Sequence, residues 1–431
     1  MSPETVGIIG IAILVVLLFA RMWIGLAMAI IGFLGYAYLR DFGGAFTVVA
    51  QIPFTTIAYY PIACIPLFLL MGTVVSNTKM GEDLYDTAYT WIGRLRGGLA
   101  MATVIACALF AAITGVSIAA AATMSKITLP EMRRYKYDDS LASGCVACAG
   151  TLAILIPPSL AFILYGIITE QPIGKLFMAG IFPGILLSGL FILTIIIITT
   201  LRPEAGPAGP KTSFKEKIVS LKNTWHMILL FLLVLGGIYG GIFTPTEAGA
   251  VGAFGAILIT AVSRRLTPKN FLVSLLEAGK TTAMVMLLII GAFIFMKFLA
   301  VSKVPFMLGE VIAVLPVPPM VTFVGIVLLY VLLGMFLDVM SALVLTLPII
   351  FPAIIALGFD PIWFGVIMVI VVEMGLVTPP VGMNVFVISG ATDIPLSTVF
   401  RGVFPFLIPM IICIALLAIF PQIALFIPSM M

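Results

Sequence analysis

Two double prolines interrupt long apolar segments of the sequence, and polar side chains flank each of them. Pro157-Pro158 is followed by Ser159, whereas Pro379-Pro380 is preceded by Thr378 and followed by Asn384. A proline has no amide donor and leaves the carbonyl group one helical turn back without its partner. Free carbonyl and hydroxyl oxygens suit a small hard cation, and the helix N-terminus after a break favours an anion. The pattern predicts cation sites beside a site for an organic anion.

Small and polar residues also interrupt two other apolar segments, 98–129 and 319–357, near their middles. We interpret both segments as hairpins that enter and leave the membrane on one side. Their tips are Thr114-Gly115-Val116-Ser117 and the stretch from Gly334 to Asp338. In this arrangement each tip faces the double proline of its own half. One cation site per half follows, with the organic substrate between them.

A double proline on its own is often only a kink in a helix. These two, however, stand at equal distances from matching landmarks. Asp138 precedes Pro157 by 19 residues, and Asp360 precedes Pro379 by 19 residues. Gly72 and Gly291 each precede a hairpin-tip glycine by 43 residues, and a Leu-Pro pair follows each tip, at Leu129-Pro130 and Leu347-Pro348. The matched spacing indicates an internal repeat and favours functional breaks over kinks.

The composition defines the surroundings of these breaks. The chain has 431 residues, of which 62% are hydrophobic and 9% charged, with a mean hydropathy of +1.27. A soluble domain has about 25% charged residues, so most of this surface must face lipid. The net charge of +4 is too small and too dispersed to indicate a nucleic-acid partner.

Ten apolar segments approach the length of about 20 residues that a membrane-spanning helix needs. They are 6–20, 23–39, 52–77, 139–169, 176–200, 225–242, 247–263, 281–300, 362–388 and 400–427. The first lacks the basic flank of a cleaved signal and is predicted to span the membrane. Two mildly amphipathic segments, 80–93 and 303–315, are predicted to lie along the interface as arms.

The basic residues support this topology. With Arg21 inside and each hairpin returning to its own side, 18 of the 22 Lys and Arg residues lie in cytoplasmic loops. The exceptions are Arg40, Lys175, Lys297 and Lys303. Such an asymmetry is typical of membrane proteins, and it places both termini in the periplasm. The first hairpin then opens to the cytoplasm and the second to the periplasm, so the repeats are inverted.

We therefore predict an all-α polytopic membrane protein with about ten spanning helices, two of them broken, and two re-entrant hairpins. The predicted parts are N-terminal scaffold helices (1–60), a first inverted repeat (61–201), a cytoplasmic linker (202–222), central scaffold helices (223–280) and a second inverted repeat (281–431). The first repeat holds an arm, hairpin 98–129, broken helix 139–169 and helix 176–200. The second holds an arm, hairpin 319–357, broken helix 362–388 and last helix 400–427.

Other chemically capable residues have competing interpretations. Glu373 lies deep in the second broken helix and either faces the site or pairs with a buried base. Glu247 follows Thr244 and Pro245, so a helix-capping role is favoured over a functional one. Cys145 and Cys148 lie in an apolar run without a nearby histidine, which favours packing over a metal site. Scarce deep carboxylates favour sodium over proton coupling, because sodium needs only oxygen ligands.

Five stretches together resemble the large membrane subunit of tripartite ATP-independent periplasmic (TRAP) transporters, the DctM-like group. They are Leu155-Ile-Pro-Pro-Ser159, Leu176-Phe-Met-Ala-Gly-Ile-Phe-Pro-Gly184, Phe243-Thr-Pro-Thr-Glu-Ala-Gly249, Gly334-Met-Phe-Leu-Asp338 and Thr378-Pro-Pro-Val-Gly382. The resemblance covers the chain from about residue 60 to its end. It implies a multi-pass protein of the bacterial inner membrane with an elevator-type mechanism and sodium as the coupling ion. The implied cargo is an organic acid such as a C4-dicarboxylate, sialic acid or a related sugar acid.

The resemblance also implies two partners, a small four-helix membrane subunit and a periplasmic substrate-binding protein. No cofactor beyond sodium is expected. The sequence departs from the family at Ala153, where glycine is usual, and at Val116-Ser117, where two serines are usual. Val116 therefore lacks a hydroxyl that the resemblance would assign to the first cation site, whereas the second break keeps the residues expected of the family.

The candidate sodium ligands comprise six residues of the first repeat and five of the second. They are Thr114, Gly115, Ser117, Ala153, Ile156 and Pro158, with Gly334, Asp338, Gly375, Thr378 and Pro380. Candidate substrate contacts just past the breaks are Ser159, Gly382 and Asn384. The predicted function is sodium-coupled import of an organic acid.

Three other functions remain as alternatives. The first is a stand-alone dicarboxylate or ion symporter or exchanger of related fold. An intramembrane enzyme is disfavoured, because the sequence has no Asp-rich diphosphate motif, no Gly-x-Gly-Asp motif and only one histidine, His226. A purely structural subunit is disfavoured because a scaffold gains nothing from paired helix breaks.

Overall fold

The computed structural model describes residues 1–78, 80–209, 212–314 and 316–431. Within these ranges every regular element is a helix. Lys79 and Lys211, two of the basic residues assigned to cytoplasmic loops, and Leu315, the last residue of the predicted arm 303–315, lie outside them. The chain is thus all-helical in the part that the structure describes, as the sequence predicted.

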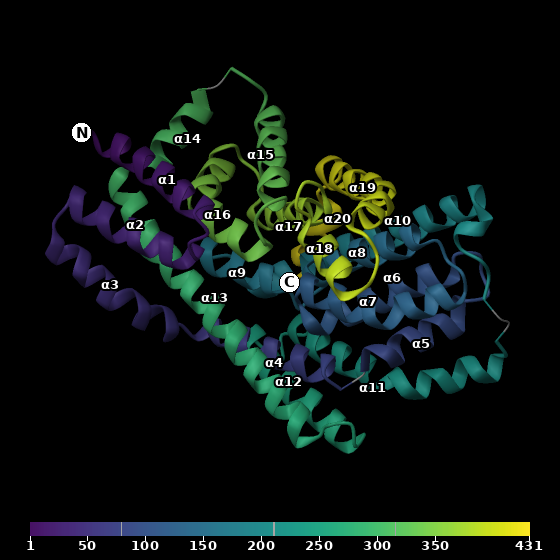
Figure 1. Cartoon of the computed structure of the whole chain (residues 1–431). Helices are drawn as coiled ribbons and strands as arrows, with labels where there is room; N and C mark the ends of the chain where they lie inside the picture. The colour runs from purple at the N-terminus through teal and green to yellow at the C-terminus, as the bar shows by residue number, and fades with distance from the viewer. Residues whose placement is uncertain (79, 210–211, 315) are drawn as a thin grey trace.

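The helices follow the chain in the order that the colours of Figure 1 show. Those before residue 210 are α1 (Pro3–Phe19), α2 (Ile24–Leu39), α3 (Phe42–Ile57), η1 (Tyr60–Ala63), α4 (Cys64–Ser76), α5 (Met80–Ile92), α6 (Gly98–Thr114), α7 (Ser117–Arg134), α8 (Asp139–Leu155), α9 (Leu160–Thr169), α10 (Ile173–Leu201) and η2 (Pro203–Ala205). Those after it are α11 (Phe214–Tyr239), α12 (Pro245–Val262), α13 (Pro268–Ser302), α14 (Val304–Val314), α15 (Pro319–Gly334), α16 (Val339–Ala356), α17 (Pro361–Val377), α18 (Met383–Ala391), α19 (Leu396–Ile419), α20 (Gln422–Leu425) and η3 (Pro428–Met430).

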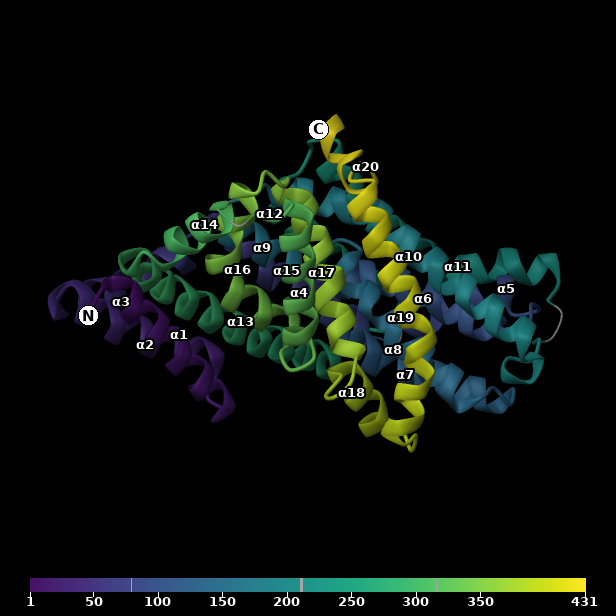
Figure 2. The same ribbon diagram turned by 90° about the horizontal axis from the view of Figure 1, so that it is seen from above.

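The long helix α13 joins two ends of the molecule. It packs on α2 and α3 toward one end and on α4 toward the other, and α1 packs on α2. Figures 1 and 2 show α1–α3 gathered at one end, away from α5 and α11. Helices α8, α9, α17 and α18, which belong to the two segments with the double prolines, lie between these ends.

The two broken helices form the centre of the fold. Residues Leu141–Leu155 of α8 and Ile362–Val377 of α17 are buried without interruption. Helix α8 packs on α6, α7 and α19, while α17 packs on α15, α16 and α19, and the two contact each other. Helices buried all round are expected in the interior of a large or membrane-embedded bundle. The breaks thus lie deep in the protein rather than at its surface.

Large apolar side chains cover the outer surface. Phe19 is 82% exposed, Leu201 76% and Val262 74%, and they are three of many such residues on the peripheral helices. An apolar exterior of this extent is unfavourable in water and suits a lipid environment. The protein is therefore a multi-pass membrane protein.

The predicted number of about ten spanning helices is not confirmed. Among the described residues, five helices are long and apolar enough to cross a membrane, or eight if each bent pair forms one span. A helix of at least 18 residues is needed to cross the membrane in this count. Helices α1 and α17 have 17 residues each and α2 has 16, so all three are too short. An apolar run in the sequence includes residues of the adjoining turns, so it exceeds the helix inside it.

The single span predicted at 52–77 is wrong. Helix α3 begins at Phe42 and ends at Ile57, and the chain then bends by 58° into the segment Tyr60–Ser76. Pro61 stands in the short helix η1 between them, where it lacks an amide donor to continue the ladder of α3. Because Tyr59, Tyr60 and Pro61 are not charged, hydropathy did not reveal the bend.

Three other boundaries differ from the predictions. Residues 214–222 of the predicted linker form the first turns of α11, since Ser213 and Glu216 make a capping box. Helix α13 starts at Pro268 rather than near 281. The last helix, predicted over 400–427, ends at Ile419, and Pro421 precedes the short α20.

Local capping explains several sequence landmarks. The carboxylate of Asp138 accepts hydrogen bonds from the amides of Ser140 and Leu141, at 2.9 and 3.0 Å. Asp360 caps α17 in the same way. These matched aspartates begin the two broken helices, which accounts for their place in the repeat.

The capping role predicted for Glu247 is confirmed. Its carboxylate accepts from the amide of Thr244 at 2.8 Å, and its own amide donates to the Thr244 hydroxyl at 3.3 Å. This reciprocal pair satisfies two amides at the start of α12. Glu247 therefore has a structural function that needs no ligand.

Candidate functional site

The first hairpin tip lies against the first break. Gly115 ends α6 in the left-handed conformation, with φ of 63°. The amide of Leu160 donates to the Gly115 carbonyl at 3.4 Å. A methyl group on Gly115 would stand 2.8 Å from the carbonyl oxygen of Pro158, so only glycine fits this approach. The structure thus brings together Gly115 and Pro158, two of the predicted cation ligands.

The polar groups around this contact differ in their hydrogen-bond partners. Thr114 donates its hydroxyl to the Phe110 carbonyl at 3.2 Å. Ser159 accepts from the Phe162 amide at 3.4 Å and caps α9. Ile156 ends α8, with its amide bonded to the Leu152 carbonyl at 2.8 Å.

Ala153, Pro158 and Ser117 are buried at or beside the same contact. The Ser117 hydroxyl has no hydrogen-bond partner among the described residues. Among the predicted ligands of the first half, Ser117 therefore has a hydroxyl that is free to bind a ligand.

The second hairpin tip meets the second broken helix backbone to backbone. A methyl group on Gly375 would stand 2.6 Å from the Cα of Gly334, and one on Gly334 would stand 2.5 Å from the Val372 carbonyl oxygen. Real Cβ atoms do not approach other atoms this closely, so both positions require glycine. The structure thus joins two more of the predicted ligands, one from the tip and one from the break.

Asp338 and Thr378 are engaged within their own helices. Asp338 caps α16, where its carboxylate accepts from the amides of Met340 and Ser341, at 3.1 and 3.4 Å, and from the Ser341 hydroxyl. The Thr378 hydroxyl donates to the Met374 carbonyl at 2.6 Å. In the part of the chain that the structure describes, no hydrogen bond joins Asp338 to the second break. Thr378 is half-buried and Pro380 exposed, so this break is more open than the first.

Asn384 connects the two halves. Its side chain is fully buried at the start of α18, and its amide nitrogen donates to the Ala147 carbonyl of α8 at 3.4 Å. Its amide oxygen is buried without a partner in the described ranges. Gly382, two residues earlier, adopts φ of 64° beside the ring of Phe400. No hydrogen bond between described residues joins Asn384 to Ser159, the other candidate substrate contact.

Glu373 is a residue whose role the sequence left open. It is 1% exposed, and both carboxylate oxygens are buried without a hydrogen bond to any described residue. None of the three ion pairs formed by described residues includes it. Pairing with a buried base is thus not found, and the carboxylate instead lies beside the Ser117 hydroxyl. Composition alone offered no signal for this contact between the halves.

Two residues of the predicted region carry buried oxygen atoms without a hydrogen-bond partner among the described residues. They are Ser117, through its hydroxyl, and Glu373, through its carboxylate. The described residues include no group of three or more His, Cys, Asp or Glu side chains that could hold a metal ion. Oxygen donors without sulfur or imidazole suit an alkali or alkaline-earth ion better than a transition metal.

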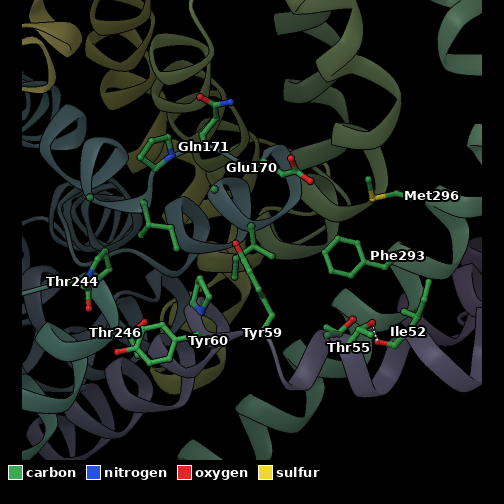
Figure 3. Close-up of a pocket in the computed structure, with 18 of the residues that line it drawn as sticks. Ile52, Thr55, Tyr59, Tyr60, Glu170, Gln171, Thr244, Thr246, Phe293 and Met296 are labelled. Atoms are coloured by element: carbon green, nitrogen blue, oxygen red, sulfur yellow. Dashed lines mark hydrogen bonds between the residues drawn. The ribbon is translucent and has the colours of Figure 1, made fainter.

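A separate cavity of 930 Å³ lies between the predicted scaffold helices, the first repeat and the C-terminal part of α13. Figure 3 shows Ile52 and Thr55 of α3, Glu170 and Gln171 after α9, and Phe293 and Met296 of α13 around it. None of the predicted ligands lines it. Sequence reasoning missed this cavity because its lining comes from several loops and helix ends that only the tertiary fold brings together.

The sequence is similar to those of known membrane transporters. A model of the family described as "Tripartite ATP-independent periplasmic transporter, DctM component" matches residues 11–423. The chain is 37% identical over 377 residues to the C4-dicarboxylate TRAP transporter large permease protein DctM of Pseudomonas aeruginosa, covering 87% of this chain and 88% of that protein. It is 33% identical over 416 residues to the sialic acid TRAP transporter large permease protein SiaM of Vibrio cholerae, covering 96% of each.

Solved structures show a related fold. The Alcanivorax borkumensis YdaH transporter superposes with a TM-score of 0.61 at 16% identity, covering 89% of this chain and 90% of that chain. Neisseria gonorrhoeae MtrF superposes with a TM-score of 0.55 at 13% identity, covering 96% of this chain and 95% of that chain. At these identities the likeness concerns the fold alone. The family match over nearly the whole length carries the assignment: this chain belongs to the DctM component family of the tripartite ATP-independent periplasmic transporters.

Proposed function

We propose that this protein imports an organic acid across the bacterial inner membrane by sodium-coupled secondary transport. The observation that carries the proposal is the contact of each hairpin tip with its broken helix at Gly115–Pro158 and Gly334–Gly375. Irregular backbone deep in a membrane protein persists where it lines a binding site. The relatives named for C4-dicarboxylates and sialic acid support an organic acid as the cargo.

The chain's own groups would form the proposed ion and anion sites. Main-chain carbonyls at the two breaks, with the hydroxyls of Ser117 and Thr378 and the carboxylate of Asp338, would hold sodium. A bound sodium ion would supply positive charge for an anionic substrate. The N-terminus of α18, with the buried Asn384 amide, favours the anion itself.

The proposed mechanism is an elevator movement of the central bundle. Helices α8–α10 and α17–α19, with the hairpin pairs α6–α7 and α15–α16, would move together against α2, α4, α12 and α13. The support is that each hairpin tip contacts the broken helix of its own half, at Gly115–Pro158 and Gly334–Gly375, so that each pair would travel together. A small four-helix membrane subunit would enlarge the stationary part, and a periplasmic binding protein would deliver the substrate.

Sodium dependence is the first expected outcome. In proteoliposomes containing this chain and both partner proteins, replacing external sodium with choline should reduce uptake of a labelled C4-dicarboxylate or sialic acid at least about tenfold, because the charge that balances the substrate is lost. Potassium serves as a second control for ionic strength. Equal uptake in choline would exclude sodium coupling.

The same preparation tests the alternative function. Omitting the binding protein should abolish net uptake if the protein functions as proposed. Uptake by this chain alone, at the rate of the complete system, would identify a stand-alone symporter or exchanger instead.

A further inference from the structure

Glu373 is a buried carboxylate with no charge-balancing partner among the described residues. It lies in α17, five residues before Thr378, and only 1% of its surface is exposed. Both carboxylate oxygens lack a hydrogen bond to the described part of the chain. The ion pairs found there join Arg133 to Asp139, Arg134 to Glu131 and Arg265 to Asp83. The residue therefore has no structural partner of the kind that Glu247 has.

Ser117 is the polar side chain next to this carboxylate. It is the last residue of the first hairpin tip and the first of α7, and it is 1% exposed. Its hydroxyl lies beside the Glu373 carboxylate, yet no hydrogen bond of ordinary geometry joins them. The two residues belong to opposite halves of the chain. Three oxygen atoms without partners thus meet where the first hairpin touches the second broken helix.

An arrangement of this kind is costly unless a ligand completes it. Removing a carboxylate from water without a compensating charge costs several kcal/mol, and membrane proteins retain such groups mainly for function. The carboxylate brings one negative charge, which one monovalent cation balances. Carboxylate and hydroxyl oxygens are hard donors that suit sodium.

We propose that Glu373 and Ser117 are ligands of a sodium site shared between the two repeats. The proposal rests on the sodium coupling proposed above and adds to it a ligand that neither half supplies alone. Because the site needs the first hairpin beside the second broken helix, on whose α18 part α7 packs, bound sodium would hold the two halves in contact.

The test is sodium-dependent stabilisation of the purified full-length chain. Melting temperature is measured in choline chloride while sodium chloride replaces it at constant ionic strength, since a ligand of the folded state raises the melting temperature. For Glu373→Gln we expect the sodium concentration for half-maximal stabilisation to rise about tenfold or more, as for loss of other metal-site groups. In choline alone its melting temperature should equal or exceed that of the wild type, because an unbalanced buried charge is gone.

Three further variants complete the experiment. Glu310→Gln changes an exposed glutamate of α14 and should respond to sodium like the wild type. Glu373→Asp keeps the charge and should retain a sodium response at a shifted midpoint. Ser117→Ala removes the other ligand and tests the site independently, should Glu373→Gln fail to give folded protein.

The outcomes separate this proposal from the function on which it rests. A wild-type midpoint in either Glu373→Gln or Ser117→Ala, with the wild type responding to sodium, would overturn the shared site and leave sodium coupling intact. A wild-type protein whose melting temperature ignores sodium would overturn both. Raised midpoints in both variants and an unchanged Glu310→Gln would support the site.

Discussion

Replacing Gly375 with alanine is expected to abolish uptake. The added methyl group would stand 2.6 Å from the Cα of Gly334 and 2.7 Å from the Val331 carbonyl oxygen. Neither atom belongs to a flexible side chain, so the second hairpin must move away from the broken helix. Overpacking of this kind costs about 1–3 kcal/mol or more. We expect a loss of more than about 100-fold in uptake, because an ion site between these segments loses its geometry.

A matched control is available in the hairpin itself. Gly325 lies in α15, like Gly334, but a methyl group there would meet no atom within 4 Å. Gly325→Ala should transport at the wild-type rate. The measurement is initial uptake in proteoliposomes, normalised to the amount of folded protein by size-exclusion chromatography. If Gly375→Ala transports normally, the tip and the break do not cooperate in function.

Asn384→Asp is expected to have the second large effect. Asn384 is fully buried, and its amide oxygen faces no described partner. The aspartate would place a negative charge beside the proposed anion site, away from any ion-pair partner. A buried unpaired charge costs about 3–5 kcal/mol, which corresponds to a loss of more than about 100-fold in uptake of an organic anion.

Asn384→Ala separates charge from shape. It removes the hydrogen bond to the Ala147 carbonyl without adding charge, so we expect a reduction of about tenfold or less. Substrate concentration curves for both variants show whether the loss lies in binding. If the aspartate variant transports the anion as well as the alanine variant does, Asn384 does not contact the substrate.

The sequence by itself determined what depends on local chemistry. The composition placed the chain in lipid, because no soluble core needs so many apolar residues. Prolines at 157–158 and 379–380 predicted the two breaks, since a missing amide ends a helix whatever its neighbours are. Capping by Thr244 and Glu247 was also readable, because both partners lie within one turn. The motifs around these positions identified the family that the comparisons then established.

Hydropathy was a weaker guide to helix ends. The bend at Tyr60–Ala63, the start of α13 at Pro268 and the end of α19 at Ile419 all differ from the apolar runs. An apolar run indicates that a segment is surrounded by lipid or protein, but it does not indicate where the helix bends or ends. The predicted number of spans was affected for the same reason.

Only the tertiary structure decided which residues meet. Gly334 and Gly375 are 41 residues apart in the sequence, and nothing in their types shows that their backbones touch. The proximity of Ser117 to Glu373, and of Asn384 to Ala147, joins opposite halves of the chain. Asp338 was predicted as a ligand from its place in the hairpin tip, and the fold adds that its carboxylate caps α16. Such contacts depend on how whole helices pack, and packing is set by the shapes of many side chains together.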